Sequence, residues 1–161
     1  MRISTPGRIC FFGEHQDYLG LPVIAAAISR RISVEGTRRD DHKIILHLPD
    51  LGTTEEFSLE TTFPYVKQRD YFRSTVNVVK RKGLTFSKGF ECTIHGNIPI
   101  NSGTSSSSAL IVSWAHFLDK LSDNPLNFSK KELGEIANAA EVLEFGEPGG
   151  MMDNYSTAIG H

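Results

Sequence analysis

The sequence predicts an α+β domain in which a sheet packs against helices. Short apolar segments bounded by turn residues are typical of strands and fill the N-terminal part of the chain, and two amphipathic helical patterns follow them. Because strands precede these helices instead of alternating with them, α+β is favoured over α/β. The 161 residues contain no repeat and no low-complexity linker, so we expect one domain with a substantial buried core.

The strands are predicted from short apolar runs and from alternation of apolar and polar residues. The predicted strands are residues 8–12, which we expect to be buried, and residues 23–28, 32–37, 43–48, 56–59 and 90–95. Between the first two lies a loop, residues 13–22, with an unusual density of Glu, His, Asp and Tyr.

Three segments predict helices. Residues 70–82 place apolar side chains at helical spacing, and Gly83 ends that segment. The second helix has one continuous apolar stripe, made by Leu110, Trp114, Phe117, Leu118 and Leu121. The third begins with a capping box, Ser129 and Glu132, and ends at the Gly- and Pro-rich residues 145–150.

The charge balance and the cysteine content exclude several classes of protein. Lys and Arg number 17 and Asp and Glu number 19, for a net charge of −2, with no basic cluster. This balance argues against a nucleic-acid partner or a polybasic membrane anchor. No apolar run reaches the roughly 20 residues that span a bilayer, and charges interrupt the N-terminus where a signal peptide needs an apolar core. Two cysteines make no disulfide framework. We therefore expect a cytoplasmic protein.

The strongest local signal is the run of small residues from Asn101 to Ser108, which opens the second helix. A helix N-terminus leaves backbone N–H groups unpaired and attracts phosphate, and Gly103 would let the backbone approach the anion closely. The alternative is a capped helix after a flexible loop, because serines cap helices everywhere. It is not a Walker P-loop, since no Gly-Lys-Ser/Thr follows the glycine.

Two further segments carry weaker signals. The polar residues 14–18 could fix the hydroxyls of a sugar, or could form a solvated hairpin loop. Asp153 follows Gly149 and Gly150 and could be a positioned base, or the N-cap of a last helix.

Taken together, the three segments resemble the motifs of the GHMP kinase superfamily, within it the galactokinase-like sugar kinases. Residues 6–18, 96–108 and 141–153 are similar to the family's first, phosphate-binding and catalytic motifs, in the family order. The resemblance implies a ribosomal protein S5 domain 2-like fold, with a mixed sheet packed against helices. It also implies ATP- and Mg²⁺-dependent transfer of a phosphoryl group to a sugar hydroxyl, for galactokinases the anomeric one.

The resemblance assigns roles to individual residues. It implies that Asp153 is the catalytic aspartate and that Arg8 pairs with it. It places Glu14, His15, Asp17, Tyr18 and Gly150 at the sugar. It places Asn101, Ser102, Gly103, Thr104, Ser105, Ser106 and Ser107 at the ATP phosphates, and Ser107 and Glu141 as ligands of Mg²⁺, which prefers hard oxygen donors.

The resemblance covers the N-terminal half of the family pattern. Residues 1–161 correspond to the substrate- and ATP-phosphate-binding domain, and the family's C-terminal domain, with a third glycine-rich motif, is absent from this chain. Such a half is expected to be weakly active or inactive alone, and to self-associate through its exposed interdomain face. Two alternatives remain open: a GHMP kinase for a sugar other than galactose, and a kinase-like sugar and ATP sensor without turnover.

Overall fold

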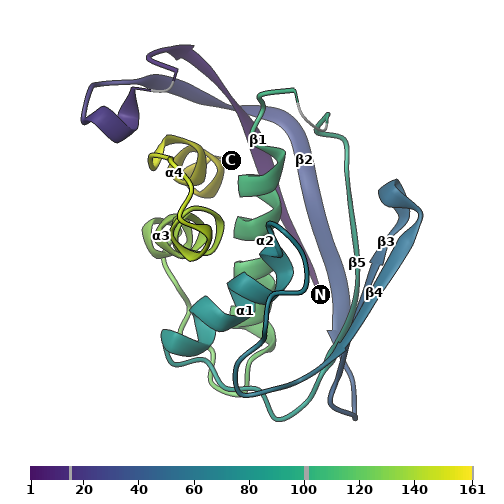
Figure 1. The fold of residues 1–161 in the computed structure, drawn as a ribbon. Coiled ribbons are helices and arrows are strands. Elements are labelled where there is room, and N and C mark those ends of the chain that lie inside the picture. The colour runs from purple at the N-terminus through teal and green to yellow at the C-terminus, as the bar shows by residue number, and fades with distance from the viewer. Residues whose placement is uncertain (15, 100–101, 161) are drawn as a thin grey trace.

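The computed structural model describes residues 1–14, 16–99 and 102–160, in which four helices cover one face of a five-stranded sheet (Figure 1). The strands are β1 (Arg2–Phe12), β2 (Ile24–Arg38), β3 (Lys43–Leu48), β4 (Thr53–Ser58) and β5 (Phe90–Gly96). The helices are α1 (Tyr71–Arg81), α2 (Ser106–Leu121), α3 (Lys130–Glu141) and α4 (Met152–Ile159). The predicted α+β class, with a mixed sheet packed against helices, is confirmed.

The sheet has the strand order β1-β2-β5-β3-β4, with β3 and β5 parallel and the other neighbours antiparallel. The chain passes from β3 to β5 through β4 and α1, the kind of crossover that a parallel pair needs. Along β5, Phe90, Cys92 and Ile94 are buried and alternate with half-buried Glu91 and His95. This alternation shows that one face of the sheet packs on the helices and the other remains polar.

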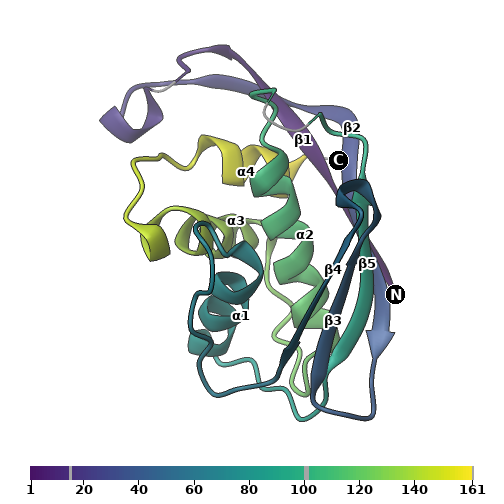
Figure 2. The ribbon, with the colours of Figure 1, turned by 45° about the vertical axis from the view of Figure 1, so that its right-hand side comes forward.

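Helix α2 lies at the centre of the helical layer, between the sheet and the other helices (Figure 2). Trp114 and Phe117 on α2 are fully buried, with stacked rings 5.6 Å apart. The indole N–H of Trp114 donates to the carbonyl of Phe72 on α1 at 3.2 Å. The core therefore holds α2 rigidly, and with it the N-terminus of that helix.

The start of α3 agrees with its sequence signal, whereas the start of α4 does not. The capping box of α3 is present: Ser129 Oγ accepts from the Glu132 N–H at 3.3 Å, and Glu132 Oε2 accepts from the Ser129 N–H at 2.8 Å. The N-cap of α4 is Met151, so Asp153 lies inside the first turn. The interpretation of Asp153 as an N-cap is therefore wrong.

The two strands predicted over residues 23–28 and 32–37 form one strand of 15 residues, β2. The polar residues between them do not interrupt the backbone pairing, because β1 pairs with β2 on both sides of them. Arg31, for example, donates from Nε to Ser4 Oγ of β1 at 2.9 Å. The register shifts at two places, between Pro6 and Arg8, where the extra residues lie on β2, and between Cys10 and Phe12, where the extra residue lies on β1.

The strand predicted over residues 8–12 is the end of a longer strand and is not buried throughout. Arg8 is 3% exposed, whereas Phe11 and Phe12 are 56% and 71% exposed. Residues 9–14 and 16–24, here called the arm, reach past α4 (Figure 1). They carry half of the large apolar side chains that are exposed among the described residues. The apolar run predicted a core strand because the sequence alone does not show which end of the sheet the helices cover.

Within the described ranges, no helix combines the length and the apolar content that a membrane-spanning segment needs.

Candidate active site

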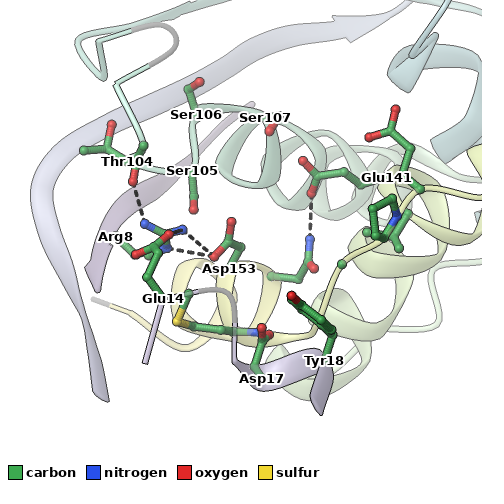
Figure 3. A pocket seen from close by; sticks show the side chains of 18 of the residues that line it. Arg8, Glu14, Asp17, Tyr18, Thr104, Ser105, Ser106, Ser107, Glu141 and Asp153 are labelled. Carbon is green, nitrogen blue, oxygen red and sulfur yellow. Dashed lines mark hydrogen bonds and ion pairs between the residues drawn. The ribbon is translucent and has the colours of Figure 1, made fainter. Parts of the chain in front are cut away.

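The three predicted segments meet in one pocket of about 370 Å³, between the arm, the N-terminus of α2 and the start of α4 (Figure 3). The pocket has the size of a small-molecule site. Its lining includes Arg8, Glu14, Asp17, Tyr18, Ser102, Gly103, Thr104, Ser105, Ser106, Ser107, Glu141, Gly150 and Asp153. Two other predicted site residues, His15 and Asn101, lie outside the described residues.

Arg8 and Asp153 form an ion pair in this pocket. Arg8 donates from Nε at 2.8 Å and from Nη2 at 2.6 Å, and both bonds end on Asp153 Oδ1. Its third nitrogen, Nη1, donates to the carbonyl of Gly103 at 2.5 Å. The arginine side chain is 4% exposed and that of Asp153 is 38% exposed. A buried cation thus fixes a carboxylate that still faces the pocket.

The Pro-Gly-Arg sequence on β1 lets the strand approach the segment just before α2 closely. A Cβ at Gly7 would lie 2.8 Å from the carbonyl oxygen of Thr104, so no larger residue fits there without a shift. The Arg8 N–H donates to the same carbonyl at 3.1 Å. This contact places the Arg8 side chain directly beside the N-terminus of α2.

The N-terminus of α2 has the features of an anion site more than those of a simple cap. Ser105 is its N-cap, with a left-handed φ of 54° and no side-chain cap bond. Ser105 is 8% exposed, and its Oγ is buried with no hydrogen-bond partner among the described residues. Figure 3 shows this hydroxyl pointing toward Arg8 and Asp153. An orphaned polar atom at a helix N-terminus favours phosphate binding over the capped-loop alternative.

Asp17 is held against the loop that precedes α4. Its Oδ2 accepts from the Met152 N–H at 2.8 Å, and a Cβ at Gly150 would lie 1.8 Å from that oxygen. Gly150 therefore leaves the space that the carboxylate occupies. Tyr18 is 53% exposed and Glu14 carries a half-exposed side chain at 3.3 Å from Arg8 Nη2. Asp17 thus ties residues 16–18 to the pocket, unlike a freely solvated hairpin.

Glu141 lies at the last position of α3 and lines the pocket. Its Oε2 accepts from Ser108 Oγ at 2.7 Å and from Asn154 Nδ2 at 2.9 Å. Ser107, the other predicted metal ligand, also lines the pocket. Among the residues that the structure describes, no three His, Cys, Asp or Glu side chains gather as a metal-binding group. A cation bound here would need further oxygen ligands from a bound small molecule and from water.

Several pocket residues were not predicted as site residues from the sequence, among them Arg69, Tyr71 and Glu147. Arg69 donates from Nε and Nη2 to the two oxygens of Glu147, at 2.6 and 2.8 Å. Burial, with the negative charge of Glu141, raises the pKa of Tyr71 to about 12, so the phenol stays protonated. Arg69 and Tyr71 belong to no motif, and Glu147 lies within residues 141–153 but was assigned no role. Only the fold brings the segment at the start of α1 to the loop after α3.

A second, more apolar pocket of about 460 Å³ adjoins the first. Both pockets include Arg69, Tyr71, Ser106 and Ser107 in their linings. The apolar lining of the second consists of Ile32, Leu48, Leu51, Phe72, Ile94, Ile98 and Leu110. A ligand bound at the N-terminus of α2 could therefore extend an apolar part into this pocket.

Comparison with known proteins agrees with this geometry. Residues 70–161, more than half of the chain, match the family of GHMP kinases N terminal domain. The chain belongs to this family. Residues 1–38 also match the galactokinase galactose-binding signature. The resemblance to galactokinase-like GHMP kinases is thereby confirmed.

The relatives of this chain include galactokinases. It is 36% identical over 160 residues to a galactokinase of Haemophilus influenzae, covering 98% of this chain and 41% of the relative. It is 33% identical over 163 residues to a galactokinase of Actinobacillus succinogenes, covering 99% and 42%. The chain thus spans about two fifths of the length of these relatives.

Solved structures of the family have the same fold. The crystal structure of Lactococcus lactis galactokinase complexed with galactose has a TM-score of 0.87 and 32% identity, with 99% of this chain and 42% of that chain covered. Methanococcus jannaschii mevalonate kinase has a TM-score of 0.86 at 21% identity, covering 99% and 51%, which shows the fold alone.

Proposed function

We propose that residues 1–161 form the sugar- and phosphate-binding domain of an ATP- and Mg²⁺-dependent kinase that phosphorylates a sugar, at the anomeric hydroxyl. The observation that carries the proposal is the Arg8–Asp153 pair, which faces the orphaned Ser105 hydroxyl at the N-terminus of α2. An acceptor-activating carboxylate and a phosphate-binding helix end then share one pocket. Phosphoryl transfer asks of a protein mainly such positioning and electrostatic stabilisation.

On the acceptor side, Asp153 orients the attacking hydroxyl and takes its proton. Both bonds from Arg8 end on Oδ1, so Oδ2 is the oxygen available to the sugar. Arg8 fixes the carboxylate and lies close enough to steady the charge that develops on the transferred group. Glu14, Asp17 and Tyr18 on the arm, with the backbone of Gly150, bind the remaining sugar hydroxyls.

On the donor side, the described residues fit a nucleotide. The phosphates lie at the N-terminus of α2, where unpaired N–H groups and the helix dipole favour anions. The buried Ser105 hydroxyl supplies a hydrogen bond that the protein itself does not use. The adjoining apolar pocket is large enough for the nucleoside, and Ser106 and Ser107 lie at the junction.

Mg²⁺ fits between Ser107 and Glu141. A hydroxyl and a carboxylate are the hard oxygen donors that this ion prefers, and it commonly takes its remaining ligands from phosphates and water. When bound, the ion neutralises charge on the phosphates. The protein contributes the placement of the two oxygens on α2 and α3.

The test is ADP release from Mg·ATP by the longest natural form of the protein, across a panel of sugars. The panel contains galactose, N-acetylgalactosamine, arabinose, glucuronate and a heptose phosphate. Turnover of one sugar supports the kinase and names its substrate. Binding of a sugar and of ATP without turnover would favour a sugar and ATP sensor over a kinase. Binding of neither ligand would overturn the proposal.

We also propose that the 161-residue chain alone self-associates through the apolar arm. Phe11, Phe12, Leu19 and Ile24 on the arm are each more than half exposed. Exposed apolar side chains gathered on one segment are typical of an interface. Sedimentation velocity should show concentration-dependent dimers that the double substitution Phe11→Ser and Phe12→Ser removes. A monomer at all concentrations would contradict this proposal.

A further inference from the structure

A network of buried polar side chains holds the carboxylate of Glu141 in place. Its two donors, Ser108 on α2 and Asn154 on α4, are each 1% exposed. Both bonds end on the same oxygen, Oε2, at 2.7 and 2.9 Å. Among the described residues no hydrogen bond ends on Oε1, so that oxygen is the one presented to a ligand.

The orientation of Asn154 is itself fixed by Asn138 on α3. Asn138 Nδ2 donates to Asn154 Oδ1 at 3.3 Å and to the carbonyl of Gly150 at 2.9 Å. Because the amide oxygen of Asn154 is already an acceptor, its Nδ2 must face Glu141. A reversed amide would lose both bonds in a place that water does not reach.

We propose that Ser108 and Asn154 are positioning residues, which hold Oε2 of Glu141 so that Oε1 points at a divalent cation. This inference rests on the proposed function, which gives Glu141 that cation. Hydrogen-bonded partners behind a metal-binding carboxylate fix its rotamer before the ion arrives, and the ion then loses no binding energy to reorganisation. Three helices, α2, α3 and α4, thereby converge on one oxygen atom.

The test uses Mn²⁺ as the probe, with its binding to the protein–ADP complex followed by electron paramagnetic resonance. Ser108→Ala and Asn154→Ala should each raise the dissociation constant of Mn²⁺ about 10-fold or more, the usual effect of removing such partners. Ser113→Ala is the matched control. Ser113 is also buried on α2, but it lines neither pocket, and its hydroxyl lies 3.4 Å from the carbonyl of Ile32.

Each outcome decides between defined alternatives. Wild-type Mn²⁺ affinity in both variants would overturn the positioning role and leave the proposed function standing. Equal weakening by Ser108→Ala and Ser113→Ala would show only the cost of a lost buried hydroxyl, and would also overturn it. No Mn²⁺ binding by the wild-type complex would remove the cation from Glu141, and the proposed function would fail with it. Melting temperatures measured in parallel identify a variant that does not fold. In that case the Mn²⁺ affinity of the other variant decides whether the positioning role holds.

Discussion

Asp17 and Gly150 are complementary in shape, although 132 residues separate them. The carboxylate of Asp17 occupies the space that a side chain at position 150 would fill, with Oδ2 only 1.8 Å from the place of a Cβ. The same oxygen accepts from the N–H of Met152 at 2.8 Å. The arm and the loop that precedes α4 are therefore joined by a contact that only glycine at position 150 permits.

Gly150→Ala should displace Asp17 and weaken sugar binding. Losing a hydrogen bond to a charged group of this kind corresponds to about a 10- to 100-fold loss of affinity. Titration calorimetry with the sugar identified by the panel measures it. Gly146→Ala is the control: Gly146 lies in the same loop with a φ of 61°, but an added Cβ meets nothing within 4 Å. Equal affinities for both variants would exclude a role of the Asp17–Gly150 contact in sugar binding.

Gly103→Val should abolish nucleotide binding while the protein still folds. Gly103 has a φ of 68° and open space around it, so valine would strain the backbone by on the order of 1–3 kcal/mol and cover the N-terminus of α2. Gly83→Val serves as control, since Gly83 has a φ of 107° and follows α1, away from both pockets. Nucleotide affinity is measured by fluorescence titration. If Gly103→Val kept its affinity for the nucleotide, the segment would have to be interpreted as a plain helix cap.

The stability of the fold should decrease as the pH rises from 9 to 12. Burial raises the pKa of the Cys92 thiol from about 9 to about 12 in the folded state. Above pH 9 the unfolded chain therefore releases a proton that the folded chain retains, and unfolding is favoured by up to about 4 kcal/mol. Below pH 9 both states keep the proton and the effect vanishes.

Urea unfolding at each pH tests this effect. Cys92→Ala should flatten the decrease in the free energy of unfolding, whereas Cys10→Ala, at a half-buried thiol outside the core, should leave most of it. An unchanged slope in Cys92→Ala would mean that this thiol is not buried as described.

Much of the site was predictable because its residues carry local signals. The polar run that follows β1, the small residues at the start of α2 and the glycines before Asp153 each depend on a few neighbouring residues. Their order along the chain then matched a known family, and the fold brings all three segments to one pocket. Local sequence signals were thus enough to identify the segments that form the pocket.

What the sequence could not predict depends on distant contacts. Ser108 looked like one more small residue of the loop, and only the packing of three helices makes it a partner of Glu141. Arg69 and Glu147 meet across 78 positions, and no local signal marks them as partners. The exposure of Phe12 likewise follows from which end of the sheet the helices cover.

The most direct test of the account is to measure turnover and sugar affinity together in Asp153→Asn, in the longest natural form of the protein. ADP release should fall at least ~100-fold, because the acceptor hydroxyl loses its base, while sugar affinity changes little. Asp40→Asn, at a surface carboxylate paired with Lys88, should leave both unchanged. Turnover of Asp153→Asn at the wild-type rate would contradict the assignment of Asp153 as the group that activates the sugar.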